Sequence, residues 1–207
     1  MSEETDRARA AEQTSFYGEG HRRLQDRFDS RRIADRLEAV TLHDEFTAGD
    51  RAFIAKSPMF FLATVDASGR PDVSYKGGDP GFVQVLGDRE LAFPHYDGNG
   101  MFRSLGNILH NPNVALLFID FERPDRMRVN GTAILDDDEA LSGRWPGAQL
   151  AVRVVPERIF PNCPRYIHRM HLVERSVYVP RGSVDPPVPE WKQMDVFRDA
   201  LPGGGKT

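Results

Sequence analysis

Apolar residues change their spacing near residue 58, from a helical period to a strand-like one. Between residues 24 and 40 they recur every three or four positions, with a slip at Asp29-Ser30. This predicts two short helices with an N-cap at Asp29-Ser30 and a third helix that opens at Thr47. Later apolar runs alternate with turns rich in glycine or proline, which predicts β-hairpins. The expected strands cover residues 59–65, 71–76, 82–86, 90–94, 114–121, 126–135, 149–160 and 171–179.

A further short helix is expected within residues 93–113, after a turn rich in glycine and asparagine. Asn111-Pro112 ends it, because proline lacks an N–H group and disfavours helical conformation in the preceding residue. We expect its first turn to carry Asn99, Arg103 and Ser104. Free backbone N–H groups, a guanidinium and a hydroxyl together suit a phosphate. By itself the same pattern also fits a solvated helix cap.

These elements predict a mainly β (α+β) fold: a small antiparallel barrel with a helical N-terminal segment and short internal helices. We expect a single domain over residues 17–202, a flexible arm over 1–16 and a frayed tail over 203–207. The proline-rich stretch before Trp191 is expected to pack over another part of the molecule. The glycines of residues 77–81 lack the spacing of a dinucleotide-binding loop.

Charge and composition limit the classes of partner that the protein is expected to bind. The 207 residues carry a net charge of -4, so no global field attracts nucleic acid or an anionic membrane. The lone cysteine, Cys163, excludes an intrachain disulfide and fits a reducing compartment. Neither a signal-peptide apolar segment nor a spanning run of about 18 apolar residues occurs, which predicts a cytoplasmic protein. The acidic run at residues 136–139 is expected to cap a helix, and no His or Cys spacing beside it suggests a metal.

Several separated motifs, in this order along the chain, resemble those of the pyridoxamine 5'-phosphate oxidase-like flavoproteins. More closely, they resemble the subgroup described as oxidase-related FMN-binding proteins. The resemblance covers roughly residues 21–202, and the motifs lie at residues 59–76, 77–82, 93–113, 128–131 and 160–166. It implies an FMN-binding split β-barrel and a homodimer, with one FMN per subunit held in the groove between the two chains.

The resemblance also implies positions for the cofactor. The FMN-phosphate segments of the family fall on Ser74, Tyr75, Lys76, Asn99, Arg103 and Ser104. The residues expected beside the flavin or its substrate are His95, Tyr96, Arg165 and Tyr166. From the residues alone, His95 and Tyr96 fit rim packing equally well. Cys163 fits either an inert buried thiol or a stabilised thiolate.

The C-terminal segment departs from the family pattern. The oxidase ends in a segment with Trp and Arg that recognises flavin and substrate, and the segment from Trp191 onward does not match it. Arg169 and His171 have the spacing that the oxidase uses on its substrate's phosphate, in different surroundings; strand alternation would place both on one face. Oxidation of pyridoxamine phosphate is therefore one alternative among several.

The expected function is that of an FMN-dependent oxidoreductase acting on an unidentified small substrate, with a small-molecule electron donor or acceptor. Because the isoalloxazine performs the redox chemistry, no catalytic residue is assigned. The alternatives are a flavin-binding module without turnover, and a deazaflavin- or haem-binding member of the same barrel fold.

Overall fold

The computed structural model describes residues 15–182 and 186–202 and divides into two compact units, residues 1–43 and 44–207. The first unit contains helices α2 (Glu19–Arg27) and α3 (Arg31–Thr41), which the apolar spacing predicts. Ser30 is the N-cap of α3, although its side chain makes no capping hydrogen bond. The expected arm over 1–16 and the tail over 203–207 lie, apart from residues 15 and 16, outside the described residues.

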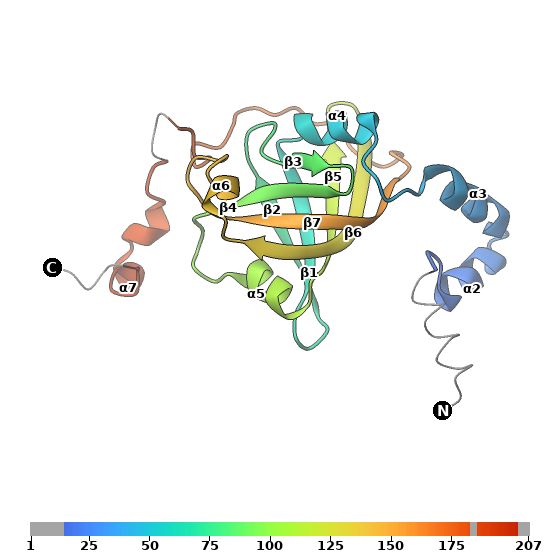
Figure 1. Cartoon of the computed structure of the whole chain (residues 1–207), viewed down its shortest axis with the longest axis horizontal. Helices are drawn as coiled ribbons and strands as arrows, with labels where there is room; N and C mark the ends of the chain where they lie inside the picture. Colours follow the sequence, from blue (N-terminus) through green and yellow to red (C-terminus); the bar gives the residue numbers. More distant parts are fainter. Residues whose placement is uncertain (1–14, 183–185, 203–207) are drawn as a thin grey trace. The chain divides into compact units, whose positions relative to one another are not determined.

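One seven-stranded antiparallel sheet forms the second unit (Figure 1). The strand order is β2-β1-β5-β6-β7-β4-β3, so β2 and β3 are edges and the sheet is not closed. The mainly β (α+β) class is therefore confirmed, and seven of the expected strands are present. They are β1 (Met59–Val65), β2 (Pro71–Gly77), β3 (Gln84–Gly87), β4 (Glu90–Tyr96), β5 (Asn113–Asp120), β6 (Asp125–Asp136) and β7 (Ala148–Pro161).

The eighth expected strand, residues 171–179, is wrong. This segment has no ladder partner and no regular secondary structure. Ion pairs hold it instead: the guanidinium groups of Arg175 and Arg181 both reach the carboxylate of Asp79. Consequently the expectation that Arg169 and His171 share one strand face is also wrong.

Short helices precede, interrupt and follow the run of strands, and two of their N-caps lie at residues that the sequence marks. Thr47 is the N-cap of α4 (Ala48–Lys56), where its Oγ1 accepts from the N–H of Asp50 at 3.2 Å. Asp138 caps α6 (Glu139–Ser142) by accepting from the N–H of Ala140 at 2.8 Å, which confirms the interpretation of the acidic run. The other helices of the second unit are α5 (Arg103–His110), η1 (Glu190–Gln193) and α7 (Asp195–Arg198).

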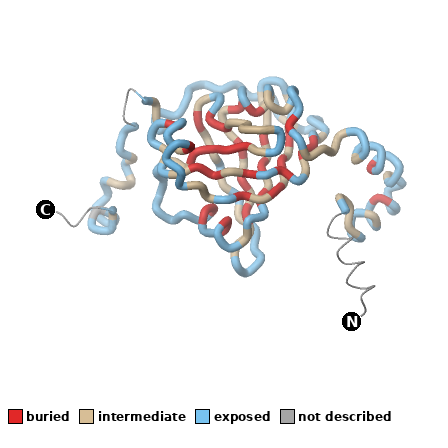
Figure 2. The backbone as a smooth tube through the Cα atoms, in the orientation of Figure 1, coloured by how far each residue is buried: buried red, intermediate tan, exposed pale blue. Residues whose placement is uncertain are grey.

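The core lies along the inner face of the curved sheet, where buried residues alternate with more exposed ones (Figure 2). Phe60 packs edge-on against Phe93, with ring centroids 4.9 Å apart. On β6, Val129 is buried while Arg128 and Asn130 face the other side, as alternation predicts. Gly131 sits so close to β7 that a Cβ would lie 2.1 Å from the Val155 carbonyl oxygen, so only glycine fits there.

Helix α5 docks beside β1 through a buried hydrogen bond (Figure 1). The amide of Asn107 donates to Thr64 Oγ1 at 2.9 Å, and both side chains are buried. Leu105 and Ile108 bury the apolar side of the helix. This docking fixes the first turn of α5 close to the edge strand β2.

Candidate functional site

Strand β2 turns its predicted site residues to two opposite faces. Lys76 pairs with Phe60 and Ser74 pairs with Leu62 across the ladder, and cross-strand partners point to the same face. Lys76 and Ser74 therefore face the side on which the core lies. Tyr75 faces outward, where its ring lies 6.1 Å from that of Phe61. The sequence places these three residues together, and the structure separates Tyr75 from the other two.

The Lys76 ammonium is half-buried and lacks a partner. It makes neither a hydrogen bond nor an ion pair with any residue in the described part of the chain. Burial lowers its pKa, and the nearby Asp72 carboxylate opposes that change. A partly desolvated cation without a partner costs free energy, which a bound anion would offset. Lys76 therefore fits a phosphate group.

His95, at the end of β4, lies close enough to Lys76 to sense its charge. Burial lowers the pKa of the imidazole, the positive charge of Lys76 lowers it further, and Asp97 opposes both. Burial and the Lys76 charge therefore favour the neutral form of the ring. It packs against Phe102, with ring centroids 5.4 Å apart.

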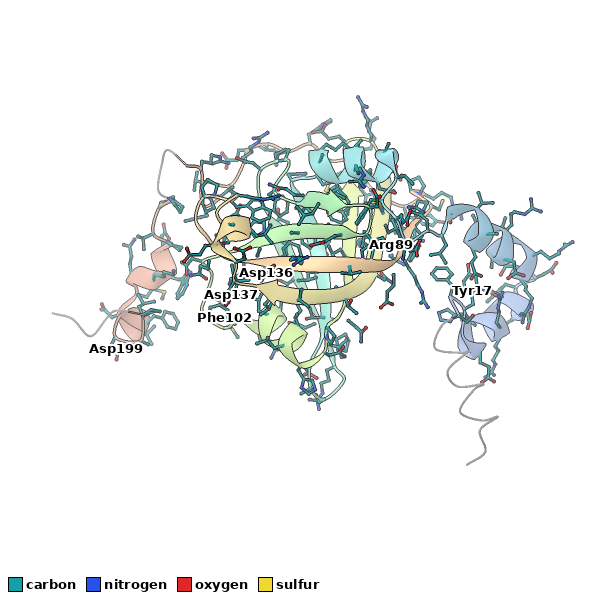
Figure 3. All side chains as sticks on the ribbon, viewed as in Figure 1. Tyr17, Arg89, Phe102, Asp136, Asp137 and Asp199 are labelled. Atoms are coloured by element: carbon teal, nitrogen blue, oxygen red, sulfur yellow. The ribbon has the colours of Figure 1, made fainter. Side chains whose placement is uncertain are left out.

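The start of α5 completes this group. Phe102, labelled in Figure 3, is the N-cap residue and has a left-handed backbone with φ of 49°, which is uncommon for a non-glycine residue. Arg103 follows, and its Nε lies 3.8 Å from Asp72 Oδ2 in a loose ion pair. Ser104 is buried within the first turn. We call Ser74, Lys76, His95, Arg103 and Ser104 the cationic cluster.

Asn99 does not belong to the first turn of the helix, so that expectation is wrong. Helix α5 begins at Arg103, because Phe102 takes the capping position. The Asn99 side-chain oxygen instead accepts from the backbone N–H of Met101 at 3.0 Å. This local bond shapes the loop that precedes the helix.

Tyr96 lies on the other side of β4 from His95. A bulge separates them: His95 pairs with Leu150 and Tyr96 with Ala148. Burial raises the pKa of the Tyr96 hydroxyl, and the negative charge of Asp79 raises it further. Tyr96 and Tyr75 both line a cleft of about 970 Å³.

Sequence reasoning missed this cleft. Its opposite wall is formed by side chains from the segment 170–179. We call residues 170–181 the strap. The strap is joined to the sheet unit at both ends: the N–H of Met170 donates to the Phe121 carbonyl at 3.0 Å, and Arg181 makes two hydrogen bonds to Asp79. The available signal was the pair of arginines following an apolar run, but their common partner lies about a hundred residues earlier.

Arg165 and Tyr166 lie in the loop after β7. Arg165 Nε lies 3.0 Å from Cys163 Sγ, and hydrogen bonds from the Arg165 backbone and guanidinium lower the pKa of this exposed thiol. Tyr166 is 94% exposed. Within the described chain, neither Arg165 nor Tyr166 makes a hydrogen bond or an ion pair with the cationic cluster.

Two further features bear on the class of site. Within residues 15–182 and 186–202, no three His, Cys, Asp or Glu side chains gather in an arrangement suited to a metal ion. Over the same residues, no helix has the length and apolar character needed to cross a bilayer.

The sequence of the second unit identifies the family. Residues 46–163 match the family model for pyridoxamine 5'-phosphate oxidase, a match that spans more than half of the chain. The chain therefore belongs to this family of flavin-binding split-barrel proteins, whose members bind flavin cofactors and often dimerise. The resemblance stated from the motifs is confirmed. No curated protein matches the chain in sequence.

Several solved structures are similar to the chain. One is HupZ from Group A Streptococcus, with 24% identity and a TM-score of 0.46 over 56% of this chain and 93% of that one. A second is HutZ from Vibrio cholerae, described as a haem storage protein, with 22% identity and a TM-score of 0.41 over 56% and 94%. A third is described as an F420 reductase, with 21% identity and a TM-score of 0.39 over 57% and 97%.

Proposed function

We propose that the protein is an FMN-dependent oxidoreductase that acts on a small organic substrate. The observation that carries the proposal is the half-buried Lys76 ammonium, which lacks a partner within the described residues and lies beside His95. A phosphate group would supply the missing charge. Arg103, held only loosely by Asp72, and the free N–H groups at the start of α5 are available to the same anion.

Four residues of the cationic cluster are proposed to hold the phosphate. Lys76 and Arg103 neutralise the phosphate, and the hydroxyls of Ser74 and Ser104 donate hydrogen bonds to it. Bound FMN supplies hydride-transfer chemistry. Tyr75, on the opposite face of β2, and Asn99, outside the helix, are proposed to contact parts of the cofactor other than the phosphate.

The proposal includes a homodimer. On the outward face of edge strand β2, Val73 and Tyr75 are 65% and 62% exposed, which favours a second copy as their cover. Among the described residues, Arg165 and Tyr166 make no hydrogen bond or ion pair with the cationic cluster of their own chain. We propose that they, together with His95 and Tyr96, border the flavin or substrate of the assembled dimer.

The first test removes the two proposed phosphate cations. Lys76→Ala/Arg103→Ala is expected to purify folded but without flavin, because the dianionic phosphate loses both charged partners. Arg51→Ala/Arg89→Ala is the matched control, since these two arginines pair with carboxylates at another place. The flavin-to-protein ratio is measured from the visible spectrum. Stoichiometric flavin in the Lys76/Arg103 variant would contradict the assignment.

The same preparation separates the alternatives. A two-banded yellow spectrum and release of FMN on denaturation support the proposed cofactor. A different chromophore identified by mass spectrometry, either a deazaflavin or haem, replaces FMN in the proposal. Reduction of bound FMN by NADH or NADPH, followed in the absence of oxygen, distinguishes an oxidoreductase from a flavin-binding module without turnover.

A further inference from the structure

We propose that the cleft beneath the strap is a binding site for an apolar organic cation. The cleft lies on the outward side of β2 with Tyr75, whereas Lys76 faces the opposite way. It is therefore separate from the phosphate site in the proposed function, and the inference goes beyond that function. Two of its lining residues, Tyr75 and Tyr96, are also proposed to lie near the flavin, so the experiments below test the two sites separately.

The walls of the cleft are mainly apolar. The sheet side contributes Met59, Ile119 and Phe121, and the strap contributes Met170, Leu172 and Val177. A volume of about 970 Å³ is at the upper end of sites that enclose small organic molecules. Three tyrosines add aromatic faces, which attract cations through the ring quadrupole; they are Tyr75, Tyr96 and Tyr178.

The charged residues at the cleft determine which sign of charge the ligand carries. Its acidic lining residues are Asp79, Asp120, Glu122 and Glu174, and its basic ones are Lys56, His171 and Arg175. Lys56 pairs with Asp120 at 2.6 Å, and Arg175 lies 3.5 Å from Asp79. Glu122 and Glu174 have no ion-pair partner among the residues that the structure describes. Arg181 also pairs with Asp79, so four carboxylates stand against the three cations Lys56, Arg175 and Arg181. The balance of these carboxylates, lysines and arginines is negative, which attracts a cation and repels a phosphorylated compound.

The strap is held in place without a ligand. Arg181 donates to Asp79 through Nε at 2.8 Å and Nη2 at 2.9 Å, a two-pronged pairing that fixes both distance and orientation. The Met170–Phe121 hydrogen bond holds the other end of the strap. A preformed site binds with a smaller ordering cost than one that must assemble around its ligand.

Two ions of equal shape test the charge selection. Tetraphenylphosphonium and tetraphenylborate each carry four phenyl rings on a tetrahedral centre and have opposite charges. In calorimetric titrations of the full chain freed of flavin, the phosphonium is expected to bind at least about tenfold more tightly than the borate. Equal affinities, a preference for the borate, or no binding of the phosphonium would overturn the proposal.

Variants locate the binding. Glu122→Gln/Glu174→Gln is expected to weaken phosphonium binding by about fivefold, because it removes the unpaired charges. Glu157→Gln, an exposed site on β7 outside the cleft, is the matched control and retains wild-type affinity. An unchanged affinity in the double variant contradicts the proposal.

One variant distinguishes the phosphate assignment from the proposal for the cleft. Lys76→Ala/Arg103→Ala is expected to retain phosphonium binding although it lacks flavin. If it loses both, the cleft is part of the flavin site and this inference fails. If it keeps both, the phosphate assignment fails and the cleft stands.

Discussion

At the scale of single residues, Lys76 and His95 combine charge with burial in a way that folding alone does not favour. Two basic groups lie close together, and burial lowers the pKa of both. Each would be more stable in water, or beside an anion. Residues that lower stability in the empty protein and gain a partner from a ligand are typical of binding sites.

His95 gives the empty protein a defined pH dependence. Its folded-state pKa lies below the ordinary value of 6.5, so the unfolded chain takes up a proton that folded His95 rejects. The free energy of unfolding is therefore expected to fall as the pH is lowered through about 6.5, and to level off below the folded-state pKa. Urea denaturation of flavin-free protein between about pH 5 and pH 8 measures it.

Substitution of His95 tests whether this residue causes the pH dependence of stability. In His95→Asn, which cannot titrate, the decrease across the same pH range is expected to be smaller. His168→Asn, at an exposed loop position, is the control. If His95→Asn keeps the full wild-type slope, another group is responsible.

At the scale of elements, α5 connects the core to the cationic cluster. A buried hydrogen bond from Asn107 to Thr64 joins it to β1, in addition to the apolar packing of Leu105 and Ile108. Burial makes this bond consequential, because loss of the acceptor leaves an amide without a partner in a dry environment. The cost appears in stability, and also in the alignment of Arg103 and Ser104.

Thr64→Val is expected to lower the free energy of unfolding by about 1–3 kcal/mol, since the Asn107 amide loses its acceptor while shape is kept. The bound-flavin ratio is expected to fall as well. Thr64→Ser keeps the hydroxyl and is expected to recover most of both losses. Denaturation and the visible spectrum give the two measurements. If Thr64→Val and Thr64→Ser lower stability and bound flavin equally, then packing, rather than the hydrogen bond, positions α5.

The elements were largely predictable from the sequence, because most of them follow local rules. Alternation locates β1 and β2, and Thr47 and the acidic run mark helix starts. The strap was not predictable, since its conformation depends on Asp79, which is distant in sequence. The sequence did not show which face of the sheet Tyr75 and Lys76 lie on, because that depends on the register of β2 against β1. The proposed cofactor contacts came from family motifs, which identify segments rather than side-chain directions.

At the scale of the whole molecule, the proposed assembly is a homodimer. Light scattering at about 10 µM is expected to give twice the chain mass of 23.3 kDa. Val73→Arg is expected to weaken association, because it places a charge on the exposed outward face of β2. Ala67→Arg adds the same charge in the β1–β2 turn and is the control. A wild-type monomer at this concentration would contradict the dimer.

The pairing of Asp79 with Arg181 also bears on the order in which the protein is made. The two residues are separated by 102 positions, and every strand of the sheet lies before the strap in the chain. During synthesis all seven strands are therefore translated before the strap that covers the cleft. A chain that stopped after β7 would contain every residue of the cationic cluster but not the strap. The residues of the proposed phosphate site are thus made before the cleft acquires its strap.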